Sequence, residues 1–101
     1  MMASGYHRRK RSGLEIKLDI LRACLKPNLL TRIMYASNIA YAPVRSYLDE
    51  LIDRGLVEEQ KQEVHLGRGR QDRRLVGFYV ITDKGLRALE QAEGLKEVLV
   101  G

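Results

Sequence analysis

Apolar residues first recur at helical spacing in the stretch that begins at Ser12. Ser12 and Glu15 form an S-x-x-E capping box, in which the serine oxygen and the glutamate carboxylate bond amides at a helix start. Leucines follow at steps of four, three and four, with Ile20 and Cys24 beside them. This spacing predicts a helix that ends before Pro27, because proline disfavours helix at the preceding residue. Its predicted buried face consists of Leu14, Leu18, Leu21 and Leu25.

Two further helices are predicted on either side of a turn at Ser37-Asn38. Thr31 is the expected N-cap of the shorter helix. The longer helix covers about residues 42–54, with Pro43 in its first turn and Gly55 at its end, where positive φ costs glycine no strain. The shorter helix carries Ile33, Met34 and Ala36. The apolar positions of the longer helix predict a buried face of Val44, Leu48, Leu51 and Ile52.

A hairpin and a last helix are predicted beyond the third helix. Residues 57–66 show a weak strand pattern, and residues 75–81 give the strongest strand signal of the chain. Residues 67–74, which contain glycines and arginines, are predicted as a long loop. Thr82 or Asp83 is the expected cap of a last helix of about three turns. Its apolar residues are Leu86, Leu89, Ala92, Leu95 and Leu99.

This order of elements is typical of a winged helix-turn-helix, an α+β, mainly α fold with a three-helix core, a two-stranded wing and a C-terminal helix. The 101 residues fit one domain. We divide them into a flexible basic arm at 1–11, a winged helix-turn-helix domain at 12–83, and a C-terminal helix at 84–101 that serves as a candidate dimerisation element.

The net charge of +5 is concentrated in two short segments. The first segment, residues 8–11, carries four positive charges. The second, residues 68–74, carries four arginines and Asp72, which gives a net charge of +3. The other residues therefore sum to −2. The basic residues are Arg8, Arg9, Lys10 and Arg11 in the arm and Arg68, Arg70, Arg73 and Arg74 in the predicted loop. A single basic run is typical of a solvated tail. Two runs that bracket an apolar core favour a polyanion, most simply DNA or RNA phosphate.

The sequence offers no constellation for catalysis or metal binding. Cys24 is the one cysteine, and His7 and His65 are the two histidines, which is too few for an internal disulfide or a zinc cluster. Gly67-x-Gly69 leads into arginines and a strand, whereas a nucleotide-binding glycine loop opens a helix. No apolar run approaches the ~20 residues of a membrane span. We therefore expect no enzyme activity, cofactor, metal, small-molecule ligand or membrane partner, and a cytoplasmic, nucleoid-associated location.

Four segments carry recognisable motifs: RSGLEI at 11–16, TRIMYASNI at 31–39, YLDELIDRGLV at 47–57 and YVITDKG at 79–85. Through them the chain resembles the small archaeal winged-helix DNA-binding proteins, both the ten-kilodalton chromatin-associated type and the related archaeal transcriptional regulators. The resemblance implies DNA binding by a homodimer whose last helices pair in an antiparallel coiled coil. The chain departs from this pattern in its short last helix with Gly94 and in its arginine-rich wing.

The third helix supplies the predicted base contacts, because the positions between its buried residues point outward. Arg45 is the leading candidate, since a guanidinium bonds guanine O6 and N7 together. The alternative for Arg45 is an ion pair with Asp49 at i+4. Thr31 and Arg32, at the start of the second helix, are predicted to bind a phosphate, with plain capping by Thr31 as the alternative. The predicted recognition-helix residues are Tyr41, Ala42, Pro43, Arg45 and Ser46.

The loop arginines are predicted to follow the phosphate backbone or a narrow minor groove. The arm, Arg8 to Arg11, is predicted to enter the minor groove like a homeodomain arm, or to anchor phosphates without specificity. Dimerisation is predicted through Ala88, Ala92, Leu95 and Leu99, which step by four, three and four. The alternative is that this face packs on its own domain, and an intertwined contact with the first helix would complete a dimer.

The sequence thus predicts a double-stranded DNA-binding protein that acts as an archaeal-type transcriptional regulator. One alternative is a chromatin-associated protein without sequence specificity. Another is a winged-helix protein–protein adaptor, which the net +3 of the loop disfavours. RNA binding is a further alternative, and it is disfavoured because the strands offer only Phe78 and Tyr79 for stacking.

Overall fold

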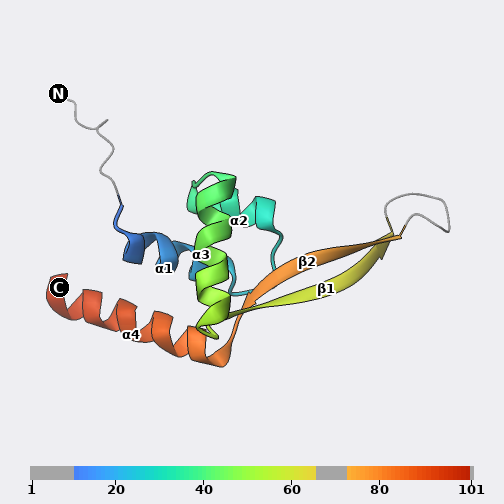
Figure 1. Cartoon of the computed structure of the whole chain (residues 1–101). Coiled ribbons are helices and arrows are strands. Elements are labelled where there is room, and N and C mark those ends of the chain that lie inside the picture. Colours follow the sequence, from blue (N-terminus) through green and yellow to red (C-terminus); the bar gives the residue numbers. More distant parts are fainter. Residues whose placement is uncertain (1–10, 66–72, 101) are drawn as a thin grey trace, which may run out of the picture.

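The structure is a computed structural model that describes residues 11–65 and 73–100. Its elements, in chain order, are α1 (Gly13–Ala23), α2 (Leu30–Ser37), α3 (Tyr41–Asp53), β1 (Val57–His65), β2 (Arg73–Ile81) and α4 (Asp83–Val100). Figure 1 shows α1, α2 and α3 gathered in one body, with the β1–β2 hairpin projecting to one side and α4 running along the bottom of the view. This order and arrangement confirm the predicted winged helix-turn-helix fold.

The capping box at the start of α1 is confirmed. The Glu15 amide donates to Ser12 Oγ at 3.1 Å, and the Ser12 amide donates to a Glu15 carboxylate oxygen at 3.0 Å. The predicted buried face is only half correct, because Leu14 and Leu25 are 63% and 51% exposed. α1 packs against α2, α3 and α4, so its inward side is wider than one row of leucines. The buried residues of α1 and its C-cap are Leu18, Ile20, Leu21 and Cys24.

The prediction that Thr31 caps the second helix is wrong. α2 has Leu29 as its N-cap, without a side-chain cap, and Thr31 lies inside the first turn. Asn28 organises the entry instead: its side chain accepts from the Leu29 amide at 3.0 Å and donates to the Ala23 carbonyl at 3.0 Å. An asparagine that bonds neighbouring backbone in this way competes with regular helix and sets where the helix can begin.

The turn and the ends of α3 follow the prediction. Asn38 ends α2 in the left-handed conformation, with φ of 57°, and Pro43 lies in the first turn of α3. Gly55 follows α3 with φ of 75°. The Gly55 amide donates to the Ile52 carbonyl and the Leu56 amide to the Leu51 carbonyl, both at 2.9 Å, which is a Schellman end. The fully buried residues of α3 are Val44, Leu48 and Leu51.

The wing is a two-stranded antiparallel hairpin in which Val57 lies opposite Ile81 and His65 opposite Arg73. β2 therefore begins at Arg73, two residues before the predicted strand, because pairing with β1 continues outward. The base of the wing is fixed by Asn28, whose amide and carbonyl exchange hydrogen bonds with Tyr79 at 3.0 and 2.8 Å. The hairpin is thus joined to the segment between α1 and α2.

α4 has 18 residues. Its bounds agree within one residue with the 84–101 given to the C-terminal helix, and its length exceeds the about three turns that were expected of it. Its predicted cap is present, since the Gly85 amide donates to Thr82 Oγ1 at 3.0 Å. Gly85 is required by close packing: a Cβ there would lie 2.1 Å from the Leu56 carbonyl oxygen. Gly94 faces open space and does not end the helix. Leu89 is the residue of α4 that enters the core.

One hydrophobic core joins all of these elements. Its buried residues are Leu18, Ile20, Leu21, Cys24, Ile33, Val44, Leu48, Leu51, Val57, Tyr79 and Leu89. Within the two described ranges, none of the helices combines the length and the apolar character that a bilayer crossing requires.

Candidate nucleic-acid interface

The N-terminal half of α3 forms an exposed surface without acidic side chains. Tyr41 is 54% exposed, and the other exposed residues of this half are Ala42, Pro43 and Ser46. Acidic residues begin at Asp49 and continue with Glu50 and Asp53. A polyanion is therefore repelled least at the N-terminal half, where the helix dipole is also positive.

Glu50, in the acidic half, is neutralised within the protein. Lys17 Nζ lies 2.7 Å from the Glu50 carboxylate, and Arg54 lies 3.1 Å from it on the same helix. The hydrogen bond from Lys17, followed by the charges of Lys17 and Arg54, lowers the pKa of Glu50. This ion pair joins α1 to α3 and so contributes to the orientation of α3.

Arg45 is held on two sides. Its Nη2 and Nε donate to Asp49 Oδ1 at 2.7 and 3.2 Å, as the i+4 alternative predicts. Its Nη1 donates to the Tyr79 hydroxyl at 2.8 Å, and its Cζ lies 5.4 Å from the centre of the Tyr79 ring. The hydrogen bonds to Asp49 and then to Tyr79 raise the pKa of Arg45. The sequence does not indicate Tyr79 as a partner of Arg45, because a contact between residues 34 positions apart leaves no local pattern.

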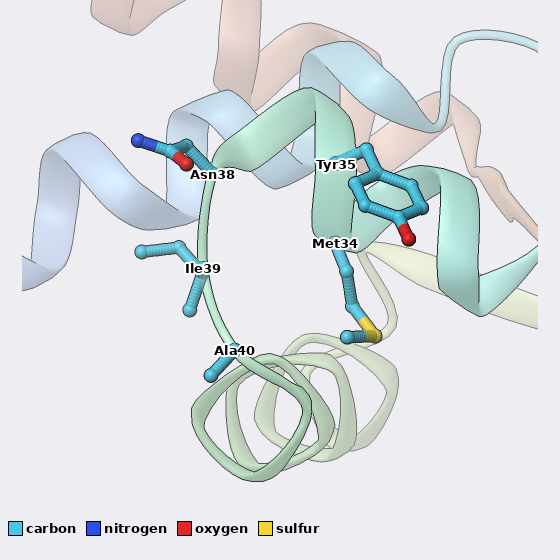
Figure 2. A pocket seen from close by; sticks show the side chains of 5 residues that line it. All are labelled: Met34, Tyr35, Asn38, Ile39 and Ala40. Carbon is cyan, nitrogen blue, oxygen red and sulfur yellow. The ribbon is translucent and has the colours of Figure 1, made fainter.

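A shallow pocket lies beside the turn between α2 and α3. Figure 2 shows that Met34 and Tyr35 approach it from α2, whereas Asn38, Ile39 and Ala40 line it from the turn. Tyr35 is 84% exposed, and the predicted phosphate-binding residues Thr31 and Arg32 are exposed at the other end of α2. The pocket thus adds an apolar hollow next to the start of α3.

The predicted wing residues divide into two groups. Arg73 and Arg74 are exposed residues of β2, not of a loop. Arg73 pairs across the hairpin with Glu63 at 3.6 Å. Arg68 and Arg70 lie outside the described residues. The two described arginines of this predicted group are therefore carried on a strand.

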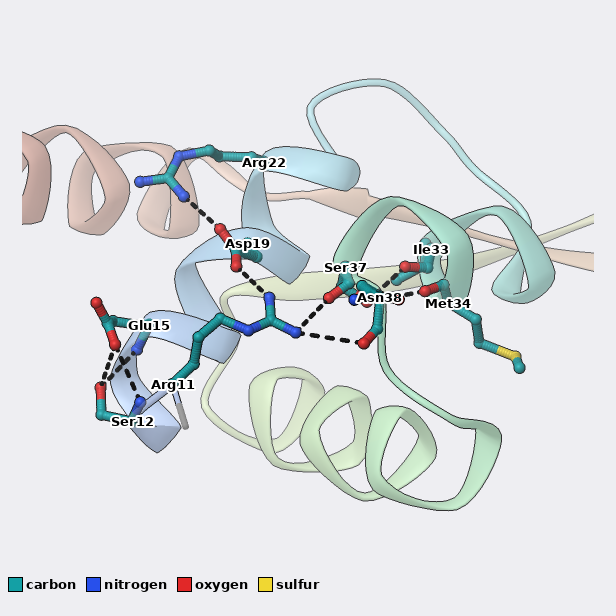
Figure 3. Close-up of polar contacts among 9 residues, drawn as sticks. All are labelled: Arg11, Ser12, Glu15, Asp19, Arg22, Ile33, Met34, Ser37 and Asn38. Atoms are coloured by element: carbon teal, nitrogen blue, oxygen red, sulfur yellow. Dashed lines mark hydrogen bonds and ion pairs between the residues drawn. The ribbon is translucent and has the colours of Figure 1, made fainter. Parts of the chain in front are cut away.

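The predicted arm contains one described residue, Arg11, and that residue is tied to the body. Figure 3 shows its guanidinium between Asp19 of α1 and the end of α2. Nη1 lies 2.6 Å from the Asp19 carboxylate, and Nη2 donates to the Ser37 and Asn38 carbonyls at 2.7 and 3.3 Å. Arg11 thereby satisfies carbonyl groups at the C-terminus of α2. Arg8, Arg9 and Lys10 lie outside the described residues.

Asp19 continues this ion-pair cluster toward α4. Arg22 lies 2.7 Å from the Asp19 carboxylate and 2.6 Å from that of Glu93. The cluster therefore links the base of the arm, α1 and α4. Such contacts between partly exposed groups contribute little stability each, but they hold Arg11 next to the helix-turn-helix turn.

Three of the four residues predicted for dimerisation, Ala92, Leu95 and Leu99, line a groove between α4 and α1, and Ala88 does not. Leu95 and Leu99 are 59% and 75% exposed, and Leu14, across the groove on α1, is 63% exposed. Ala88 and Ala92 are half-buried, with Ala92 packed against the core. The groove is lined by Leu14, Glu15, Leu18, Ala92, Leu95, Lys96 and Leu99.

The described part of the chain has no group of three or more histidine, cysteine, aspartate or glutamate side chains that could hold a metal ion. Cys24 is fully buried, and burial raises the pKa of its thiol to about 12. It packs as a small apolar residue, as the sequence predicts.

Comparison with known proteins gives a family and several similar chains. Residues 10–99 match a family model described as winged helix-turn-helix. The chain is 35% identical over 60 residues to the uncharacterised protein MJ0287 of Methanocaldococcus jannaschii. This match covers 58% of the chain and 62% of that protein, which is less than two thirds of its length.

Two crystal structures from Sulfolobus solfataricus are similar. The first, Sso10a-2, described as a DNA-binding protein, superposes with a TM-score of 0.64 at 30% identity over 88% of this chain and 85% of that one. The second, the transcriptional regulator BldR, superposes with a TM-score of 0.63 at 21% identity over 85% of this chain and 57% of that one. At the latter identity the likeness concerns the fold alone.

Proposed function

The chain belongs to the winged helix-turn-helix family, and from that premise we propose that it binds double-stranded DNA as a transcriptional regulator of the archaeal type. The N-terminal half of α3 enters the major groove, with Tyr41, Ala42, Pro43, Arg45 and Ser46 as the contacting residues. Thr31 and Arg32 bind a phosphate beside it. The wing and the arm contact the backbone or the minor groove.

The observation that carries this proposal is the distribution of charge around α3. The N-terminal half of the helix is exposed and free of acidic residues, and Arg11 places the start of the arm at the adjacent end of α2. Arg73 and Arg74 are exposed at the outer end of the hairpin, where Arg73 pairs with Glu63. The DNA-binding description of a relative that is 30% identical over most of both chains supports the same function.

Regulation at particular sequences is favoured over purely architectural binding by the surroundings of Arg45. The Asp49 carboxylate bound to Arg45 is 61% exposed and repels a phosphate that approaches this arginine. A base edge carries no formal charge, so it avoids much of that penalty. Arg45 therefore suits base contact better than backbone contact.

Binding-site selection from a random duplex pool tests this function. We expect an enriched motif, and we expect affinity to fall steeply between about 50 and 200 mM salt. Arg45→Ala should relax the preference at one base pair by about 1–3 kcal/mol, whereas the control Arg74→Ala should weaken all duplexes alike. Salt-dependent binding without enrichment would indicate the chromatin-associated alternative. Absence of salt-dependent binding would contradict DNA binding and favour the adaptor.

We also propose that two copies pair through the groove between α1 and α4. Three large apolar side chains that line it, Leu14, Leu95 and Leu99, are more than half exposed. Burying them against a second copy removes apolar surface from water. Because the groove has walls on two helices, α4 need not form a coiled coil alone.

A further inference from the structure

The wing and the recognition helix are connected by a continuous path of polar side chains. The Asp49 carboxylate accepts from Arg45, and Arg45 donates to the Tyr79 hydroxyl at 2.8 Å. The Tyr79 hydroxyl in turn donates to the Glu59 carboxylate at 3.4 Å. Glu59 lies opposite Tyr79 across the hairpin, so the path begins on α3 and ends on both strands of the wing.

The strand backbone makes room for this path. Lys61 lies opposite Gly77, two residues along from the Glu59–Tyr79 pair, so Glu59 and Gly77 are diagonal neighbours on one face of the hairpin. A Cβ at Gly77 would lie 2.6 Å from Glu59 Oε2. Glycine therefore lets the Glu59 side chain lie across β2 toward the Tyr79 hydroxyl.

Tyr79 is the rigid member of the path. It is only 4% exposed and belongs to the hydrophobic core, and its amide and carbonyl both bond to Asn28. A ring fixed in this way cannot follow a mobile arginine. Its hydroxyl and its π face instead restrict where the Arg45 guanidinium can lie.

The hydrogen bonds determine which donors Arg45 has left. A guanidinium has five N–H groups. Nε uses its one N–H on Asp49, Nη2 uses one of two on Asp49, and Nη1 uses one of two on Tyr79. Among the described residues, one N–H therefore remains without a partner on each terminal nitrogen. A guanine edge offers two acceptors, O6 and N7, to such a pair.

From this geometry we infer that Tyr79 is a positioning residue for base recognition. Its hydroxyl and ring hold Arg45 so that the two remaining N–H groups meet a guanine, and they link the orientation of the wing to that of the recognition arginine. This inference rests on the proposed DNA-binding function. In this inference, a buried residue of the wing influences which DNA sequence the protein prefers, although its burial keeps it from contacting DNA itself.

Tyr79→Phe is the direct test, since it removes the hydroxyl and keeps the ring, its packing and the strand backbone. The matched control is Tyr47→Phe, which removes a hydroxyl from a half-buried tyrosine of α3 that packs against the core. Arg45→Lys keeps the positive charge but lacks the two terminal nitrogens. All variants are compared as full chains at a temperature where thermal unfolding shows them to be folded.

The measurement compares the affinity of each variant for two duplexes. The first is the duplex obtained by site selection. The second carries 7-deazaguanine, which lacks N7, in place of the one guanine for which Arg45→Lys loses its preference. We expect the native chain to prefer guanine over its replacement by roughly 5-fold or more. Tyr79→Phe should reduce that preference by at least roughly 2-fold, toward no preference. Tyr47→Phe should preserve it, and all variants should bind unrelated duplexes with unchanged salt dependence.

The double variant separates positioning from structure. In the Arg45→Lys background, Tyr79→Phe should change the guanine preference no further, because its effect acts through Arg45. If Tyr79→Phe leaves the native preference unchanged, or lowers affinity for all duplexes alike, the positioning role is wrong and the proposed function stands. If Arg45→Lys also changes nothing, base reading by Arg45 is wrong. If no duplex is bound, the proposed function itself fails.

Discussion

At the scale of single residues, the positions that matter most are those whose role depends on a distant neighbour. Gly85 and Gly94 look alike in the sequence, as two glycines of one helix. In the structure Gly85 lies against the corner between α3 and β1, whereas Gly94 faces solvent. Arg11 likewise resembles its basic neighbours in the arm, yet it bonds the end of α2.

Gly85→Ala should destabilise the protein. The added methyl would lie 2.1 Å from the Leu56 carbonyl oxygen, which is backbone and cannot move aside cheaply. We expect a decrease of about 1–3 kcal/mol in the free energy of unfolding, measured by urea denaturation. Gly94→Ala is the control, and it should stabilise the helix by up to about 1 kcal/mol. Equal effects at the two sites would contradict the close packing of Gly85.

Cys24 should be unreactive in the folded protein. Its thiol is fully buried, and burial raises its pKa to about 12. Since the neutral thiol is favoured, the thiolate fraction at about pH 8 is small and the attack on a disulfide reagent such as dithionitrobenzoate is slow. Reaction should become fast when urea unfolds the chain. Fast reaction of the folded chain at the same pH would contradict the buried position.

At the scale of elements, α4 and the wing differ from their predictions in length. α4 continues through Gly94 to 18 residues, because Leu89 and Ala92 pack on the core and offset the low helix propensity of one glycine. β2 begins earlier than its apolar run, because cross-strand pairing continues through Arg74 and Arg73. In both elements, contacts with the rest of the fold lengthen the helix or strand beyond the segment that local propensity favours.

If two copies pair through the groove between α1 and α4, a negative charge introduced into this groove should weaken their association. Leu99→Glu would place a carboxylate among Leu14, Leu18 and Leu95, and we expect it to shift the protein toward the mass of a monomer in light scattering at micromolar concentration. Val98→Glu is the control, since Val98 is 79% exposed and does not line the groove. A native chain that is already monomeric would rule out pairing through this face.

At the scale of the whole molecule, the net charge of +5 is unevenly distributed. The arm begins where Arg11 meets the end of α2, and the wing projects from the other side of α3 (Figure 1). Arg11, the last residue of the first basic segment, and β2, which carries Arg73 and Arg74, therefore lie on different sides of α3. Under the proposed function, we expect the duplex to contact α3 between them.

The salt dependence of DNA binding should report this arrangement. Removing residues 1–10 should reduce the slope of log affinity against log salt by about 0.9 for each phosphate that the arm neutralises. The full reduction is about 2.7 if Arg8, Arg9 and Lys10 each hold a phosphate. Arg87→Ala, an exposed position of α4 that does not line the groove, is the control and should leave the slope unchanged. An unchanged slope after truncation would mean that the arm does not contact DNA.

The sequence by itself determined the kinds of element, their order and the residues that end them. These features depend on local chemistry: the Ser12 capping box, the positive φ of Asn38 and Gly55, and the apolar spacing of α3 all act within a few residues. Charge is also additive along the chain, so the excess of basic charge in two segments could be counted without a fold. The outward-facing positions of the third helix followed from the same local spacing.

Only the tertiary structure decided which side chains meet. The exposure of Leu14, the bond from Arg11 to the end of α2 and the hold of Tyr79 on Arg45 each join residues that no local period connects. Such contacts depend on the angles at which helices and strands pack, and those angles are set by the whole core at once. The candidate residues could therefore be named from the sequence, but the positions in which they act required the fold.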